Sequence, residues 1–244
     1  ETLYNNGVPL NSITSENLKA WYKLDQSANW DLSGSGYWQI PDAVSAYPQS
    51  FDFVPNDDIN CGTNSIFDIT ENITLSGWIN RDVNTNTDVI ISKWASGSNT
   101  AYLLRVKTTG GAAGNSKIEM LIRNTSGTLV TAAEDVGEVC INKWAHIMGT
   151  YNGSTIRLFY NGVELGSGTA QTGNIQTSTA PLRIGSRGSE YTDGKMSNVA
   201  IWNSDQSSEI SNIYNSGVPA ISYTNTPSAW YKLDNTATFS TNWS

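Results

Sequence analysis

Apolar and polar residues alternate with a period of two along most of the chain. The clearest stretch is 143–165, KWAHIMGTYNGSTIRLFYNGVEL, in which two Asn-Gly pairs separate three alternating apolar runs. Because the side chains of a strand point alternately to opposite faces, this pattern predicts strands with one buried face. Asn-Gly favours a turn in which both central residues have positive φ. The stretch is therefore predicted to be a three-stranded meander with tight turns at 152–153 and 161–162.

The rest of the chain predicts many more short strands and very little helix. Clusters of Gly, Ser, Thr and Asn separate the apolar runs, as turns do in all-β proteins. Only residues 207–215 have the pattern of a helix, which Ser207 or Ser208 could cap and Gly217 could end. Further strands are predicted near 19–24, 50–54, 58–61, 73–80, 88–93, 101–107, 117–123, 128–132, 181–185 and 195–202. We expect an all-β fold, an antiparallel two-sheet jelly-roll sandwich of roughly a dozen strands with one short C-terminal helix.

Two segments near the start of the chain recur near its end. Residues 3–9, LYNNGVP, are repeated as IYNSGVP at 213–219, and AWYKLD occurs at both 20–25 and 229–234. Repeats at one fixed offset, here about 210 residues, are typical of tandem arrays. One unusual domain that contains two similar strands is the alternative.

The repeat suggests where one unit begins and ends. We expect residues 1–17 to be the tail of a preceding repeat with its linker, 18–217 to be a complete β-sandwich, and 218–244 to be a linker and the first strand of a following repeat. Only one AWYKLD copy can fill a given strand position in one domain. We expect the first copy to fill it and the second to pack on the domain surface or on a neighbouring molecule.

Composition and charge exclude several classes of function. The net charge is −8, and the 14 Lys and Arg residues are scattered, whereas nucleic-acid or anionic-membrane binding needs clustered basic residues. No apolar run reaches the roughly 20 residues that a membrane-spanning helix needs, so no membrane insertion is expected. Cys61 and Cys140 are too few for a disulfide framework or a zinc site. They are either buried free thiols or one disulfide.

Several segments together resemble a known family. They are AWYKLD at 20–25, FDFVPNDDINCG at 51–62, ITLSGWIN at 73–80, VIISKW at 89–94, KWAHIMGTYNGSTIRLFYNGVELG at 143–166, LRIGSR at 182–187, DGKMSNVAIWN at 193–203 and SSEISNIYNSG at 207–217. Their order resembles the laminin-G-like domains of the concanavalin A-like lectin/glucanase superfamily. The resemblance implies a jelly roll with adjacent first and last strands, in an extracellular, cell-surface or virion-surface protein.

The function that the resemblance implies is a non-enzymatic binding or adhesion module. Its partners would be a glycan or protein surface ligand and neighbouring copies of the same repeat. A spacer repeat without its own ligand is the main alternative, and a degenerate glycan hydrolase is a third. A hydrolase needs two carboxylates facing one cleft, but Glu134 and Glu138 are separated on one strand face by Val136, so no catalytic residue is predicted. His146 lies within a strand and is interpreted as a packing residue.

Aromatic and acidic residues supply the candidate site. Trp21, Trp78, Trp144 and Trp202 lie on predicted strands and are interpreted as core, whereas loop aromatics could stack on a sugar. The candidate ligand-binding residues are Trp30, Trp38, Trp94 and Tyr191, with Tyr47 and Tyr102 as weaker ones. The resemblance also implies one structural calcium ion, and the oxygen donors at the corresponding places are Asn56, Asp57, Asp58 and Asp193. Two departures from the family pattern, Val54-Pro55 and Ser197, weigh against calcium.

Overall fold

The chain divides into two compact units, Glu1–Tyr47 and Pro48–Ser244. In this computed structural model, the described residues are 50–83, 87–109, 115–137 and 141–233, together with the backbone of 29–30 and 38–39. In the first unit, β1 (Asn29–Trp30) and β2 (Trp38–Gln39) pair as a short antiparallel ribbon. The second unit contains the sandwich.

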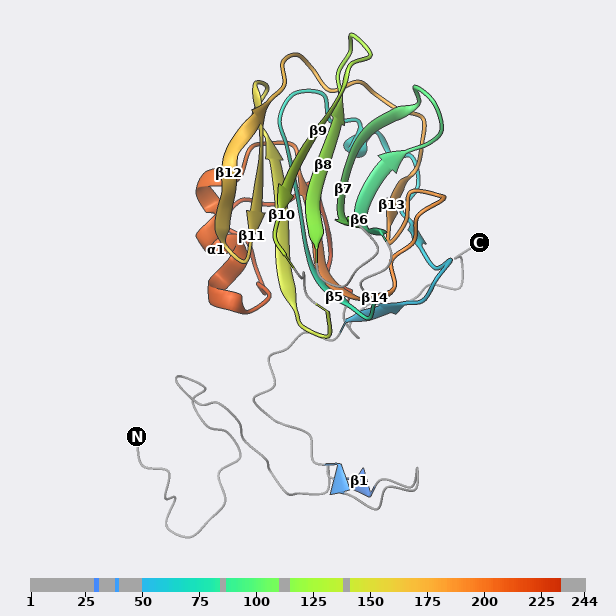
Figure 1. Cartoon of the computed structure of the whole chain (residues 1–244), viewed down its shortest axis with the longest axis vertical. Coiled ribbons are helices and arrows are strands. Elements are labelled where there is room, and N and C mark those ends of the chain that lie inside the picture. The colour runs from blue at the N-terminus through green and yellow to red at the C-terminus, as the bar shows by residue number, and fades with distance from the viewer. Residues whose placement is uncertain are drawn as a thin grey trace. The chain divides into compact units, whose positions relative to one another are not determined.

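The sandwich consists of two antiparallel sheets that face each other (Figure 1). In the seven-stranded sheet the order is β12 (Val163–Ala170), β11 (Thr155–Tyr160), β10 (Ala145–Tyr151), β5 (Ile73–Arg81) and β14 (Gly194–Trp202). Beyond β14, the short strands β3 (Phe51–Phe53) and β15 (Ala229–Tyr231) follow one another along its outer edge. In the six-stranded sheet the order is β4 (Ile59–Asn60), β13 (Leu182–Ile184), β6 (Thr87–Trp94), β7 (Thr100–Thr108), β8 (Ser116–Arg123) and β9 (Leu129–Asp135). The predicted all-β sandwich is confirmed.

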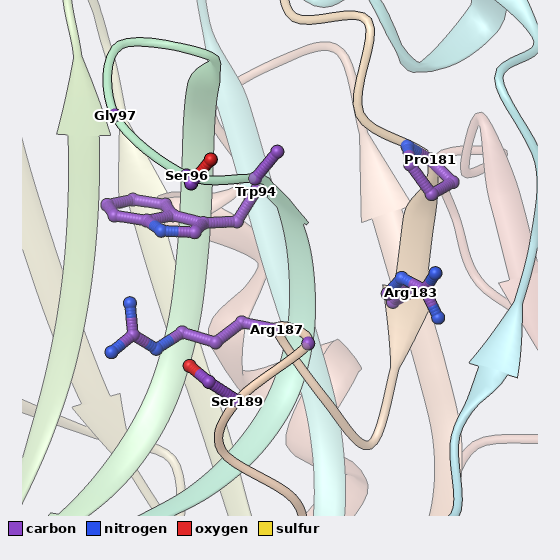
Figure 2. Close-up of a pocket in the computed structure, with 9 residues that line it drawn as sticks. Trp94, Ser96, Gly97, Pro181, Arg183, Arg187 and Ser189 are labelled. Carbon is purple, nitrogen blue, oxygen red and sulfur yellow. The ribbon is translucent and has the colours of Figure 1, made fainter.

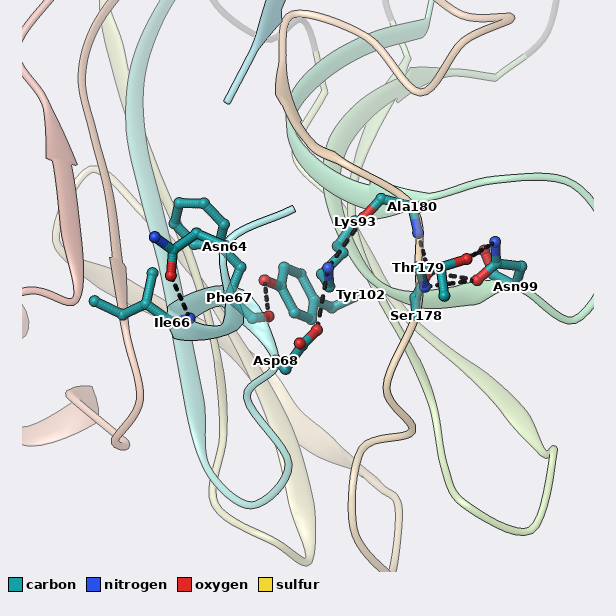
Figure 3. Close-up of polar contacts among 10 residues, drawn as sticks. All are labelled: Asn64, Ile66, Phe67, Asp68, Lys93, Asn99, Tyr102, Ser178, Thr179 and Ala180. Carbon is teal, nitrogen blue, oxygen red and sulfur yellow. Dashed lines mark hydrogen bonds and ion pairs between the residues drawn. The ribbon is translucent and has the colours of Figure 1, made fainter. Parts of the chain in front are cut away.

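The core lies between the two sheets and is built from alternate residues of each strand. Fully buried examples are Ile73, Leu75 and Ile79 of β5, Leu104 and Val106 of β7, and Ile118, Met120 and Ile122 of β8. Tyr102 is also buried there, and its hydroxyl donates to the carbonyl oxygen of Phe67 at 2.8 Å (Figure 3). Tyr102 is therefore a core residue, and its prediction as a ligand-binding aromatic was wrong.

A fully buried ion pair crosses from one sheet to the other. Nε of Arg81, at the end of β5, lies 2.5 Å from Oδ2 of Asp88 on β6, and both side chains are 0% exposed. Arg81 also donates to the hydroxyls of Ser116 and Thr108, each at 3.1 Å. Burial raises the pKa of Asp88 to about 6, although the Arg81 guanidinium acts in the opposite direction. Removing either partner would leave a buried charge uncompensated, which costs about 3–5 kcal/mol.

The two Asn-Gly pairs form different turns. Asn161 and Gly162 have φ values of 48° and 82° and join β11 to β12 as the predicted two-residue hairpin. The turn at 152–153 differs from the prediction, because Asn152 does not have positive φ and the loop from β10 to β11 includes Ser154. There the Asn152 side chain accepts from the amides of Ser154 and Thr155 at 3.1 and 2.9 Å, which closes the turn locally.

The predicted C-terminal helix is shorter than the sequence pattern suggests. It comprises a 3₁₀ turn at Ser207–Glu209, the helix α1 (Ile210–Tyr214) and a second 3₁₀ turn at Asn215–Gly217. The predicted serine cap was wrong, because the Asp205 carboxylate accepts from the amide of Ser207 instead. The helix ends at Asn215, which adopts φ 48°, and not at Gly217. No helix among the described residues is long and apolar enough to cross a membrane.

The C-terminal helix rests on a stack of aromatic rings outside the sandwich core. Tyr214 stacks on Trp78 of β5 with ring centroids 5.7 Å apart, and His146 of β10 lies 5.3 Å from Trp78. His146 is 1% exposed, and its Nε2 lies 2.8 Å from the Ser76 hydroxyl. Burial lowers its pKa to about 3. Trp78 and Trp202 are buried as predicted, but Trp78 is under this helix, and Trp144 is only half-buried.

The strand beside the end of β14 is the second AWYKLD copy. Val199, Ala200 and Ile201 pair with Tyr231, Trp230 and Ala229 of β15. The prediction that residues 20–25 fill this position therefore differs from the structure, and those residues lie outside the described part of the chain. Tyr223, which precedes the second copy, contacts the rings of Trp230 and Trp202 with centroid distances of 4.7 and 5.1 Å. The connection that precedes the second copy therefore adds aromatic packing.

We expect Gly162→Ala to destabilise the protein more than Gly153→Ala. Both glycines have positive φ, so alanine is strained by about 1 kcal/mol at each position. A Cβ at Gly162 would lie 2.5 Å from Cδ1 of Tyr214, whereas the nearest atom to a Cβ at Gly153 is 3.6 Å away. Displacing Tyr214 should add about 1–3 kcal/mol. Urea unfolding measures both values, and equal costs would contradict the packing of Tyr214 on this turn.

His146 should make the protein less stable in acid. Its folded pKa of about 3 is below its ordinary value of 6.5, so the unfolded state binds the proton first. Its contribution is complete above pH 6.5 and is lost as the pH falls toward 3. Between pH 7 and 5 the free energy of unfolding should fall by about 2 kcal/mol from this group.

His146→Gln is the comparison for this pH dependence. The variant keeps a side chain that can bond to Ser76 but does not titrate, so its stability should change less than that of the parent protein between pH 7 and 5. Thermal or urea unfolding at both pH values measures the difference. Parallel pH profiles would show that His146 is not held neutral.

Candidate functional site

An open hollow of about 610 Å³ lies on the six-stranded sheet, on the face opposite the core (Figure 2). The side chains of β13 show on which face of the sheet the hollow lies. Leu182 and Ile184 are in the core, so Arg183 between them, which lines the hollow, points to the opposite face. The walls come from the end of β6, the loop to β7, the start of β13 and the loop after β13. The lining residues are Trp94, Ala95, Ser96, Gly97, Pro181, Arg183, Arg187, Gly188 and Ser189.

Trp94 is the aromatic wall of the hollow. It is the last residue of β6, where the register with β7 shifts between Lys93 and Trp94. Its half-buried ring packs against a small apolar cluster that includes Val89 and Leu103. The guanidinium carbon of Arg187 lies 5.9 Å from the ring centroid, within the range of a cation–π contact (Figure 2). The ring is therefore held in place while it still lines an open space.

A network of charged side chains anchors the loop that forms the other wall. Arg187 binds both oxygens of Glu190 at 2.6 and 3.0 Å, and Arg105 donates to Glu190 at 2.8 Å. Arg105 also donates to Glu119 at 2.8 Å, and the side chains of this second pair are only 9% and 7% exposed. Burial alone would raise the pKa of Glu190, but Arg187 and Arg105 outweigh it and hold the pKa below its usual value. The loop is thus fixed to β7 by partly buried, charge-assisted hydrogen bonds, and Arg105 in turn is fixed to β8 by its buried pair with Glu119.

Arg183, on the opposite side, is fixed in a similar way. Its Nη1 donates to the carboxylate of Asp58, which also accepts from the hydroxyl of Ser186 at 2.7 Å. Tyr191 pairs with Ser186 through the backbone, and its hydroxyl donates to the carbonyl oxygen of Gly188 at 3.3 Å. Asp58 and Tyr191 therefore support the hollow from outside, although they do not line it.

The structure brings together some of the predicted ligand-binding residues and not others. Trp94 lines the hollow, and Tyr191 lies on the loop that forms it. Trp30 and Trp38 pair through their backbones in the Glu1–Tyr47 unit, where side chains are not described. Tyr47 lies outside the described residues. Sequence reasoning missed Arg183 and Arg187, because only the pairing of β13 with β6 brings their segment beside Trp94.

The predicted calcium ligands do not converge in the described part of the chain. Asp57 accepts from the amide of Val54 in the β3–β4 turn, which also contains Asn56, and Asp58 binds Arg183. The backbone of Asp193 bonds to Asp82 and to the Asp88 carboxylate, each at 3.0 Å. Within the described ranges, no three His, Cys, Asp or Glu side chains form a group that could hold a metal. These residues, as arranged, do not fit a calcium site, and the single calcium ion that the resemblance implies is untested by the structure.

Two carboxylates do meet near the hollow, but not in the arrangement of a glycosidase. Glu119 and Glu190 both bind Arg105, and the lowered pKa of Glu190 keeps it ionised. Glycoside hydrolysis needs one carboxylic acid that remains protonated near neutral pH. His146 is buried beneath the aromatic stack, and Glu138 lies outside the described residues. This pair therefore offers no support for the hydrolase alternative.

Cys61 is a free thiol in this structure. It lies just after β4, packs against the core, and its Sγ lies 3.8 Å from the carbonyl oxygen of Ile59. Burial raises the pKa of Cys61 to about 11, so the thiolate is suppressed at neutral pH. Cys140 lies outside the described residues. The sequence left two interpretations open for the cysteines, buried free thiols or one disulfide. Cys61 agrees with the first, because it is a free thiol that packs against the core.

Comparison with known structures finds similar chains at low sequence identity. A heptameric SAP-like pentraxin from Limulus polyphemus is 13% identical, with a TM-score of 0.47 and coverage of 77% of this chain and 86% of that chain. Domains LG4-5 of the mouse laminin alpha1 chain are 12% identical, with a TM-score of 0.44 and coverage of 64% and 40%. The binding domain of botulinum neurotoxin serotype G is 14% identical, with a TM-score of 0.48 and coverage of 72% and 48%. The matched region spans less than half of the laminin and toxin chains.

The family is shown by the sequence itself. A comparison with curated protein sequences found no significant match. The profile of Laminin_G_3, described as the concanavalin A-like lectin/glucanases superfamily, matches residues 32–211, which is most of the chain. Together with the two-sheet sandwich, this match confirms the resemblance drawn from the motifs. The chain belongs to the Laminin_G_3 family of concanavalin A-like domains.

Proposed function

We propose that this domain is a non-enzymatic binding module that takes a carbohydrate in the hollow beside Trp94. The observation that carries the proposal is a half-buried indole, surrounded by hydrogen-bonding side chains, in an open space of about 610 Å³. Sites for small ligands are commonly about 300–1,000 Å³ and combine apolar walls with a few placed polar groups. The flat face of an indole packs on the C–H groups of a pyranose, and hydroxyls bond to the groups around it.

The charge balance of the hollow favours a neutral sugar. Arg183 and Arg187 each have a carboxylate partner, Asp58 and Glu190 respectively. Paired in this way, they present guanidinium donors close to carboxylate acceptors, a combination that suits hydroxyl groups, which both donate and accept. A strongly anionic ligand would have to compete with the carboxylates already bound. Neutral glycans are therefore the expected ligand class.

The anchoring of the loop supports binding as well as packing. Arg105, Glu119 and Glu190 hold the wall of the hollow in one arrangement before a ligand arrives. A preorganised site avoids the entropic cost of ordering side chains on binding. We propose an extracellular, cell-surface or virion-surface setting, in which glycans are accessible. The AWYKLD repeat favours a second role beside this one, as a structural unit between neighbouring repeats.

Trp94→Ala should weaken glycan binding by about tenfold or more, which corresponds to about 1.4 kcal/mol. The experiment is a glycan array with the full chain, followed by titration of the best ligand. Trp94→Phe keeps the apolar packing and an aromatic face and should retain part of the affinity. Val163→Ala, at a 64% exposed position on the other sheet, should bind like the parent protein. No glycan bound, or equal binding by Trp94→Ala, would contradict the proposal.

Calcium should not raise the melting temperature of the parent protein through Asp58. A cation that binds only the folded state stabilises it by mass action, but here it would have to displace Arg183 from the carboxylate. We expect EDTA and excess calcium to leave the midpoint unchanged. Arg183→Ala frees Asp58 and should make the midpoint more sensitive to calcium. A calcium-dependent rise in the parent protein, lost in Asp58→Asn, would establish the site that the family resemblance implies.

A further inference from the structure

The outer edge of β14 holds one of two identical segments in this chain. Residues 229–231 form β15 on that edge, and the same AWYKLD sequence occurs at residues 20–25. We propose that this edge is an exchange site, at which residues 20–25 of the same chain replace residues 229–234. This site is separate from the carbohydrate hollow and does not depend on it.

The backbone contacts of the bound copy are those of a short antiparallel strand. Residues 229–231 pair with 201–199 of β14. The carbonyl oxygen of Lys232 then accepts from the amide of Asn198 at 3.0 Å and from the hydroxyl of Ser197 at 3.2 Å. At this point β14 is irregular, because its register with β5 shifts between Ser197 and Ala200 and Asn198 adopts φ 48°. Backbone pairing of this kind depends little on which copy supplies the strand.

The side-chain contacts use only residues that both copies share. Nε1 of Trp230 donates to Oδ1 of Asn198 at 2.9 Å, and its ring packs with the cluster that contains Trp202. Tyr231 and Leu233 pack against the main core. The nitrogen of Lys232 lies 4.9 Å from the centroid of the Trp230 ring. Each of these contacting residues has an identical counterpart in the first copy: Ala20, Trp21, Tyr22, Lys23 and Leu24.

The preference for the second copy comes from outside the repeated motif. Tyr223 packs against Trp202 and Trp230, and the indole nitrogen of Trp202 donates to the carbonyl oxygen of Asn225 at 2.8 Å. Thr14 stands before the first copy at the position that Tyr223 has before the second copy. Because threonine has no aromatic ring, it cannot make the same packing contacts. The two copies therefore differ by a few flanking contacts. Among the described residues β15 pairs only with β14, so its release breaks a single strand pairing there.

The exchange has a consequence for any longer chain in which the repeat continues. Each AWYKLD copy could then complete the domain on either side of it, so that successive domains would compete for the same strand. Both copies in this chain are tethered to the site, so exchange within one chain is favoured by high effective concentration. We therefore commit to the chain's own residues 20–25 as the alternative occupant.

A set of full-chain variants tests the exchange. Trp230→Ala with Tyr231→Ala disables the second copy, Trp21→Ala with Tyr22→Ala disables the first, and a fourth variant combines all four changes. Each pair alone should lower the melting temperature by only a few degrees, because the other copy remains. The combined variant should lose about 10 °C or more, well beyond the sum of the two pairs.

Hydrogen exchange with mass spectrometry locates the occupant. Amide protection of residues 20–25 should rise when the second copy is disabled, and Tyr223→Thr should produce part of the same rise. Additive melting shifts, or unchanged protection of 20–25 in the variant that lacks the second copy, would overturn the proposal. Light scattering should show monomers in every variant. Dimers that grow with concentration only when the second copy is disabled would show that the occupant comes from another molecule, which would overturn exchange within one chain.

Discussion

The sandwich depends on one buried charge that cannot be left without a partner. Arg81 enters the space between the sheets from the end of β5, and Asp88 of β6 meets it with no access to water. Taking a guanidinium and a carboxylate out of water costs several kcal/mol each, which their mutual attraction and additional hydrogen bonds must offset. Here the additional bonds come from Ser116 and Thr108, on β8 and β7. One side chain of the first sheet is thereby tied to three strands of the second.

The same ion pair fixes the chain segment that leads to the hollow. The second oxygen of Asp88 accepts from the amide of Asp193, whose carbonyl oxygen accepts from the amide of Asp82. The preceding residue, Thr192, donates its hydroxyl to the carbonyl oxygen of Val89 at 2.7 Å. These contacts hold one end of the loop, and Arg105 and Arg187 hold Glu190 within it. The position of the hollow's wall therefore depends on the ion pair between Arg81 of β5 and Asp88 of β6 as much as on the loop's own sequence.

The parts that could be predicted from sequence are those with a local cause. Asn161-Gly162 specifies its hairpin because both residues tolerate positive φ, and period-two alternation identifies the strands. Trp94 could be proposed as a candidate because it ends a strand at a turn. Arg187 and Glu190 could not be placed beside Arg105 from sequence. Arg105 and Glu190 are 85 residues apart along the chain, and only the folded structure brings them together. The same limit applies to Asp58, whose carboxylate suits a cation until β13 brings Arg183 to it.

The AWYKLD repeat shows a different limit, since two identical local sequences cannot differ in local preference. Any preference for one copy at the edge of β14 must therefore come from flanking residues. Tyr223, which contacts Trp230 and belongs to neither copy, is such a residue. The edge of β14 at 199–201 and the hollow on β6 and β13 lie on different sheets. The start of β14, between them, is paired to Arg81 of β5 at Gly194 and held through Asp193 by Asp88. A strand that exchanges at the far end of β14 therefore leaves these contacts of Gly194 and Asp193 in place, because none of them involves β15.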